Sequence, residues 1–122
     1  MTRDEFNTYC ATYPHATHVV QWGNSDVWKI GGKVFALCGW ANDQPAFTFK
    51  ASDMAFNVLG DGPGIRPAPY LASRGMKWLQ VYDQPGHGYG LSDEALRDHL
   101  RASHDMVVAK LTKKLRTELG LT

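Results

Sequence analysis

Five histidines and two cysteines are the side chains of this 122-residue chain best suited to bind a metal ion. His99 and His104 lie five positions apart on a predicted helix, whereas two metal ligands on one helix face need a spacing of three or four. His15 and His18 have that spacing but no third ligand nearby, and His87 lies between two glycines. The sequence therefore predicts no metal site and no bound cofactor.

Nucleophilic catalysis would need a serine, threonine or cysteine beside a base and an orienting group. The chain has no G-x-S-x-G motif, and no catalytic signature surrounds Cys10 or Cys38. The glycine-rich segment GDGPG at 60–64 lacks the Lys-Ser or Lys-Thr pair of a phosphate-binding loop. We expect a protein that is not an enzyme and two cysteines that are reduced and buried. A catalytic site assembled from distant residues would escape this reasoning.

Cationic side chains are more frequent in the second half of the chain. Residues 1–65 contain four Lys or Arg and six Asp or Glu, whereas residues 66–122 contain nine and six. Ammonium groups on adjacent turns of a helix can contact phosphates of a nucleic acid. Alternatively, cations near a helix C-terminus only stabilise the helix dipole and cover apolar edges. The candidates on the final predicted helix are Lys110, Lys113, Lys114 and Arg116.

The segment RPAPYLASRGMKWLQVY at 66–82 combines prolines, cations and aromatic rings. Arg74 and Lys77 would add phosphate contacts, and Tyr70 and Trp78 would stack on bases if they are exposed. Since Trp78 lies on a predicted strand, core packing is the alternative for it. The second function that fits is a protein-binding or small-ligand-binding module that uses this segment and the sheet face. A concave apolar pocket near Tyr70 and Trp78 would favour that function.

The elements that must position these residues follow from caps, turns and periodicity. Thr2 and Glu5 form a capping box, Gly31-Gly32 is typical of a two-residue hairpin, and residues 60–69 contain too many glycines and prolines for regular structure. The order α-β-β-β-β-α-β-α predicts one α+β domain over 1–122, an antiparallel sheet of about five strands with flanking N- and C-terminal helices. The predicted ranges are a helix over 2–12, strands over 18–22, 26–30, 33–40 and 45–51, a short helix after Ser52, a strand over 76–83 and a helix from Ser92 to 119.

Overall charge and hydropathy bound the class of protein. The net charge of +1 argues against a protein that coats nucleic acid nonspecifically. No apolar run reaches the length of a membrane-spanning helix, and the polar N-terminus is unlike a secretory signal. We expect a cytoplasmic, monomeric protein.

Four segments make the chain resemble the MmcQ/YjbR family of small bacterial proteins over nearly its whole length. They are VWKIGGKVFAL (27–37), FTFKASDMA (47–55), PAPYLASRGMKWLQV (67–81) and LSDEALRDHLRASHDMVVAKLTKKLR (91–116). The resemblance implies a sandwich similar to the CyaY-like frataxin fold and a non-catalytic protein that binds DNA. The recurrent positions of the family carry over to Lys33, Lys50, Tyr70, Lys77, Trp78, Lys110 and Lys114.

The chain departs from the family pattern in two places. Ser73-Arg74-Gly75 replaces a denser basic run before the strand tryptophan, which leaves fewer cations for DNA. Thr112 stands where many members have proline, which favours an unbroken final helix. Iron binding of the frataxin type is not carried over, because the first helix offers only Asp4 and Glu5 as acids and a fold alone does not transmit function.

Overall fold

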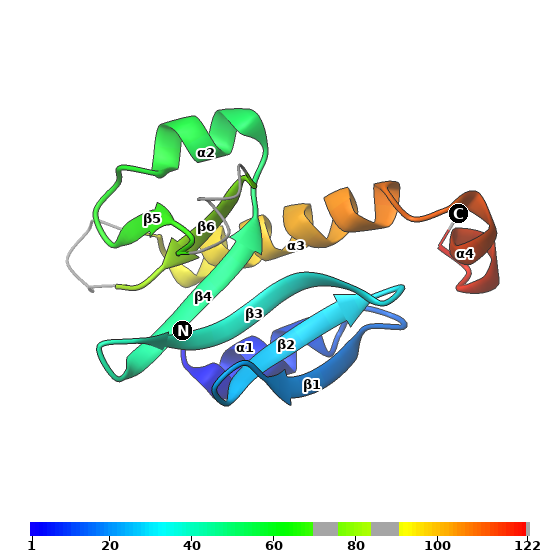
Figure 1. Cartoon of the computed structure of the whole chain (residues 1–122), viewed down its shortest axis with the longest axis horizontal. Helices are drawn as coiled ribbons and strands as arrows, with labels where there is room; N and C mark the ends of the chain where they lie inside the picture. The colour runs from blue at the N-terminus through cyan, green and yellow to red at the C-terminus, as the bar shows by residue number, and fades with distance from the viewer. Residues whose placement is uncertain (70–75, 84–90, 122) are drawn as a thin grey trace.

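The computed structural model describes residues 1–69, 76–83 and 91–121. Its six strands form one antiparallel sheet in the order β1-β2-β3-β4-β6-β5 (Figure 1). The predicted α+β class, with helices at both ends of the chain, is confirmed. The elements are α1 (Arg3–Cys10), β1 (Thr17–Gln21), β2 (Ser25–Ile30), β3 (Lys33–Ala41), β4 (Gln44–Lys50), α2 (Asp53–Leu59), β5 (Ile65–Pro67), β6 (Trp78–Val81), α3 (Asp93–Ala109) and α4 (Lys113–Glu118).

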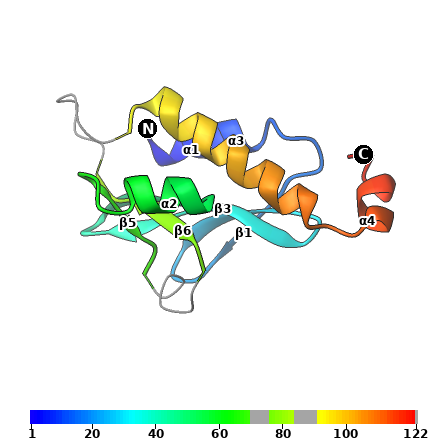
Figure 2. The ribbon, with the colours of Figure 1, turned by 90° about the horizontal axis from the view of Figure 1, so that it is seen from above.

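The helices α1 and α3 lie side by side on one face of the sheet, and Figure 2 shows no described helix on the opposite face. The core lies between these two layers. Phe6 of α1 packs its ring 5.4 Å from that of Phe47, and Phe35, Phe49 and Leu100 are fully buried. None of the described helices is long and apolar enough to cross a membrane. As Figure 2 shows, the second sheet face is free of helices in the described part of the chain.

Local sequence signals fix several boundaries as expected. The Thr2 hydroxyl accepts from the Glu5 amide while the Glu5 carboxylate accepts from the Thr2 amide, which is the predicted capping box. Gly31 and Gly32 have φ angles of 59° and 80°, so the hairpin between β2 and β3 uses the left-handed conformations that glycine adopts most easily. These caps and turns depend on short-range interactions, which is why they can be read from sequence.

Two strand predictions need correction. The prediction of irregular structure over 60–69 was wrong at Ile65–Pro67, which forms β5 and pairs with β6. β5 is one of the two edge strands, where the missing N–H of Pro67 costs no hydrogen bond within the sheet. Trp22 was placed at the end of a strand, but it lies in the turn between β1 and β2 with a φ angle of 53°.

The unbroken final helix was also a wrong prediction. The chain leaves α3 at Lys110, and Thr112 begins α4 as its N-cap by accepting from the Leu115 amide. Between the two helices, the buried Leu111 packs closely on Gly31. A Cβ atom added at Gly31 would lie 2.8 Å from the two methyl groups of Leu111. Because α3 and α4 are separate, Lys110 does not share one helix stripe with Lys113 and Lys114.

The sheet splits between β3 and β4 at the end nearest α4, as Figure 1 shows. The last paired residues there are Ala36 and Phe49. Beyond them, the Ser103 hydroxyl of α3 accepts from the Lys50 amide at 2.8 Å and donates to the Phe35 carbonyl at 2.6 Å. One hydroxyl therefore replaces the direct bond that the two strands would otherwise form.

We expect Ser103→Ala to lower the free energy of unfolding by about 1–3 kcal/mol, because it leaves a buried amide and a buried carbonyl without partners. Urea denaturation of the parent and the variant measures the difference. The control is Thr117→Ala on the exposed side of α4, which should change stability by less than about 0.5 kcal/mol. Equal stability of the Ser103 variant and the parent would show that the hydroxyl does not hold the split.

Candidate functional site

A hollow of about 470 Å³ lies where β3 and β4 diverge. Its walls are mostly apolar, and three lysines from separate parts of the chain stand at its edge. Such a volume suits a small organic ligand or one part of a larger one. The lining residues are Trp22, Lys33, Val34, Leu37, Lys50, Met76, Trp78, Val107 and Lys110.

Strand alternation places the hollow on the sheet face that α1 and α3 leave uncovered. Phe49 stacks on His99 of α3, so its neighbour Lys50 points to the other face, and Trp78 is paired with Lys50 in the sheet. Val107 of α3 and Lys110, the C-cap of that helix, come from the covered side and line the same hollow. They reach it through the split that the Ser103 hydroxyl maintains.

The three lysines of the hollow repel one another. Burial lowers the pKa of Lys50, and the neighbouring charges of Lys110 and Lys33 lower it further. No carboxylate among the described residues forms an ion pair with any of the three. Within the described residues the hollow therefore carries three lysines without an ion-paired carboxylate, and an anion bound there would relieve the repulsion on Lys50.

The structure thus brings together four of the residues singled out by sequence, Lys33, Lys50, Trp78 and Lys110. Trp78 is only 7% exposed, and the side that is accessible faces the hollow. The lining residues that sequence reasoning missed are Trp22, Val34, Leu37, Met76 and Val107. Trp22 is the most exposed of the four tryptophans at 63%, and its place in a Trp-Gly-Asn turn was the signal that could have found it.

The remaining predicted residues lie elsewhere. Lys77 forms an ion pair with Asp53 at 3.7 Å and stands over the ring of Phe56, so it faces α2. Lys113 and Lys114 are exposed on α4, and Arg116 is half-buried there. Tyr70 and Arg74 lie outside the described residues.

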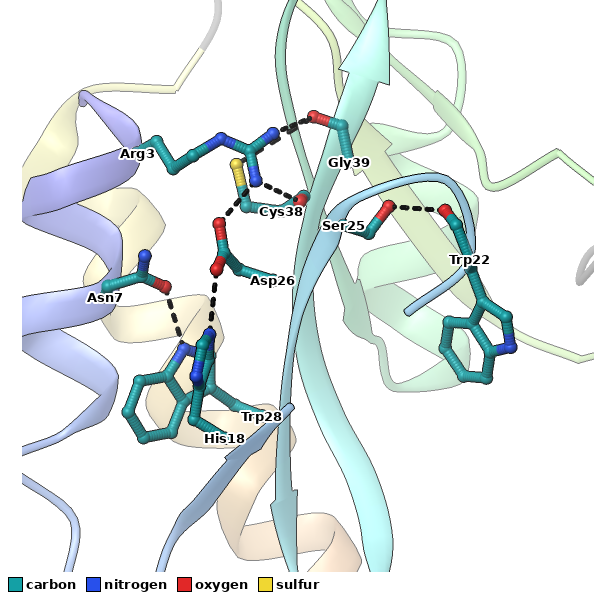
Figure 3. Close-up of polar contacts among 9 residues, drawn as sticks. All are labelled: Arg3, Asn7, His18, Trp22, Ser25, Asp26, Trp28, Cys38 and Gly39. Atoms are coloured by element: carbon teal, nitrogen blue, oxygen red, sulfur yellow. Dashed lines mark hydrogen bonds and ion pairs between the residues drawn. The ribbon is translucent and has the colours of Figure 1, made fainter. Parts of the chain in front are cut away.

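A second polar cluster lies on the covered face and ties α1 to the sheet (Figure 3). The Arg3 guanidinium contacts the carboxylate of Asp26 and donates to the carbonyls of Cys38 and Gly39, each at 2.9 Å. The other Asp26 oxygen is 2.8 Å from His18 Nε2. The Asp26 carboxylate is therefore engaged by both Arg3 and His18, and the contacts of Arg3 hold α1 against β2 and β3.

The charge state of Asp26 follows from this cluster. Burial alone would raise the pKa of its carboxyl, but the hydrogen bonds from Arg3 and His18 outweigh burial. The pKa of Asp26 therefore lies below its ordinary value, and the folded state favours the carboxylate.

Neither cysteine has the character of a nucleophile. Both thiols are free and buried, and burial raises the pKa of Cys10 above its ordinary value and that of Cys38 to about 11. A thiol with a raised pKa is protonated near neutral pH and reacts slowly. Within the described ranges, no three His, Cys, Asp or Glu side chains come together as metal ligands.

A two-layer α+β sandwich with one sheet face, the open face, that no described helix covers, and with a lysine-lined hollow in that face, is the class that fold and site define. The chain belongs to the YjbR family, whose sequence profile matches residues 11–106. An uncharacterised protein of Escherichia coli O157:H7, YbdF, is 33% identical over 91 residues, which cover 73% of this chain and 69% of that protein.

Two solved structures are similar to this fold. The DUF419 domain protein DR2400 of Deinococcus radiodurans superimposes with a TM-score of 0.81 at 25% identity, over 99% of this chain and 89% of that one. A Pseudomonas syringae protein gives a TM-score of 0.65 at 18% identity, over 87% and 98%. The predicted MmcQ/YjbR membership is confirmed, and these relatives support the sandwich.

We expect Lys110→Gln to raise the pKa of Lys50 toward its ordinary value, because of the two neighbouring positive charges it removes the one with the larger effect on that pKa. NMR titration of labelled lysine side chains measures this pKa directly. Lys114→Gln removes the same charge from exposed α4 and should leave the Lys50 pKa unchanged. An unchanged pKa in both variants would mean that the ammonium groups do not converge.

We expect Asp26→Asn to lower the free energy of unfolding at neutral pH by about 3 kcal/mol, since it leaves the Arg3 charge unpaired at a mostly buried position. The folded pKa of Asp26 is lowered, so its contribution is present above the unfolded pKa near 4 and is lost as the pH falls below it. Urea denaturation at two pH values should therefore show a gap between variant and parent that narrows in acid. The exposed Asp61→Asn is the control, and a gap independent of pH would contradict this account.

Proposed function

We propose that the protein binds nucleic acid without catalysis, and that the hollow between β3 and β4 contacts the phosphates. The observation that carries this proposal is the convergence of Lys33, Lys50 and Lys110 without a carboxylate partner in the described part of the chain. Like charges held together raise the energy of the unbound protein, and binding an anion recovers that energy. A nucleic acid strand supplies several phosphates at once and releases its counterions on binding.

DNA is the partner that we propose, in keeping with the family resemblance. The cations of α4, Lys113, Lys114 and Arg116, stand outside the hollow and would add only long-range attraction. The free cysteines fit a reducing compartment, so the proposal includes a cytoplasmic monomer that meets nucleic acid there.

The absence of catalysis belongs to the proposal and rests on how the titratable groups are occupied. Asp26 contacts both His18 and Arg3, and the raised pKa values keep the described thiols protonated. The lysines of the hollow have no general base or nucleophile among the residues that line it with them. Binding is the chemistry that such a site can perform.

A second candidate function is the binding of a small anionic ligand, and the apolar walls of the hollow near Trp78 favour it. Native mass spectrometry of the purified protein tests it by the mass of any retained molecule. A stoichiometric organic anion that survives purification, together with no affinity for nucleic acid, would replace the proposal with this candidate.

We expect the log of the DNA affinity to fall with the log of the salt concentration at a slope of about −2 to −3, because three phosphate contacts each contribute about −0.7 on single strands and −0.9 on duplex. Lys110→Gln should weaken binding to every sequence. It should also make the slope less negative by the contribution of one contact, about 0.7 on single strands or 0.9 on duplex. Fluorescence anisotropy of a labelled random-sequence DNA across a salt series measures both quantities.

The matched control is Lys114→Gln, which removes one exposed charge from α4 and should leave affinity and slope nearly unchanged. A loss at Lys114 equal to that at Lys110 would place the contact on α4 rather than in the hollow. No binding at the lowest salt would end the proposal.

A further inference from the structure

The apolar part of the hollow is larger than phosphate contact alone requires. Three ammonium groups at the edge suffice for phosphates, yet the walls are built from Val34, Leu37, Val107 and two tryptophans. A strand that only laid its backbone across the lysines would leave this apolar surface in water. The walls therefore point to a second, uncharged part of the same ligand.

Trp22 is the most accessible aromatic wall of the hollow. Its indole is 63% exposed, although an apolar ring of this size is usually covered in a folded domain. Its φ angle of 53° is uncommon for a bulky residue, and the Ser25 hydroxyl donates to its carbonyl at 3.0 Å. In Figure 3 Trp22 lies on the far side of the strands from Arg3 and Asp26. The turn thus holds a tryptophan on the open face at a cost in backbone energy, which is a pattern found at binding sites.

Exposed tryptophan beside lysine suits one chemical unit in particular. An aromatic side chain stacks on the flat face of a nucleobase, and every base offers such a face. Ammonium groups nearby bind the phosphates on either side of that base. In a duplex the flat faces are covered by neighbouring base pairs, so a base must leave the stack to reach a hollow of this kind.

We propose that the hollow binds one unpaired nucleobase of a single-stranded nucleic acid, stacked on Trp22, with the flanking phosphates on Lys33, Lys50 and Lys110. This inference rests on the proposed function and adds to it the form of nucleic acid and the unit that is recognised. It makes the protein a single-strand binder with little sequence preference, because stacking does not read the edges of the base.

The experiment compares three labelled ligands at low salt: a DNA single strand, an abasic sugar-phosphate strand of the same length, and the matched duplex. We expect the parent protein to bind the single strand at least about fivefold more tightly than the abasic strand, the contribution of one stacked base. Trp22→Ala should lose about that factor on the single strand and nothing on the abasic strand. The duplex should bind more weakly than the single strand.

The control variant is Trp40→Ala, since Trp40 is similarly exposed at 51% but stacks under the Arg3 guanidinium on the other face. It should leave all three affinities unchanged. Both tryptophans are exposed, and urea denaturation verifies that both variants fold.

The possible outcomes separate this inference from the proposed function. Equal binding of the single strand and the abasic strand, with the salt slope and the Lys110 effect retained, would overturn the base site and leave nucleic-acid binding in place. Failure of all three ligands to bind would overturn the proposed function itself. If a mononucleotide displaced the strand completely at the concentration at which the strand itself binds, the ligand of the hollow would be a free nucleotide rather than a single strand.

Discussion

The arrangement of the hollow depends on the two hydrogen bonds of the Ser103 hydroxyl. A hydroxyl can donate and accept at once, so it satisfies the Lys50 amide and the Phe35 carbonyl after the strands have parted. Had β3 and β4 paired to their ends, the Lys50 amide and the Phe35 carbonyl would have bonded directly. The paired strands would then have separated α3 from the open face. The split allows Val107 and Lys110 to line a hollow whose other residues belong to the open face.

The lysine charges of that hollow are the basis of the proposed anion binding. Burial first, and then the charges of Lys110 and Lys33, lower the pKa of Lys50 in the folded state, which opposes folding at neutral pH. Side chains that weaken the folded state are expected at functional sites, where a protein loses some stability in exchange for binding. The core offsets this cost elsewhere, through fully buried side chains such as Phe35, Phe49 and Leu100.

Sequence reasoning succeeded where a structure depends on neighbours in the chain. The capping box at Thr2, the cap at Ser92 and the glycine hairpin at Gly31 are local, and all lie where expected. It failed where distant residues decide. The helix α3 is capped at Lys110, and the next residue, Leu111, packs on Gly31, which lies eighty positions earlier in the chain. Helical periodicity in the sequence cannot predict a contact over that distance. The sequence predicted only part of the hollow. Its lysines were separate candidate residues, but the split that brings them together depends on a serine in the middle of a helix, which no sequence pattern indicated.

The two faces of the sheet use similar side chains to opposite effect. On the covered face Arg3 pairs with Asp26 and the indole of Trp28 donates to Asn7, so these two side chains are engaged with their own chain. On the open face the lysines have no acid, and Trp22 has no hydrogen-bond partner for its indole within the described ranges. Since buried polar groups that satisfy one another hold a fold together and unpaired exposed ones remain available, the covered face accounts for stability. The chemistry left over for a partner lies on the open face.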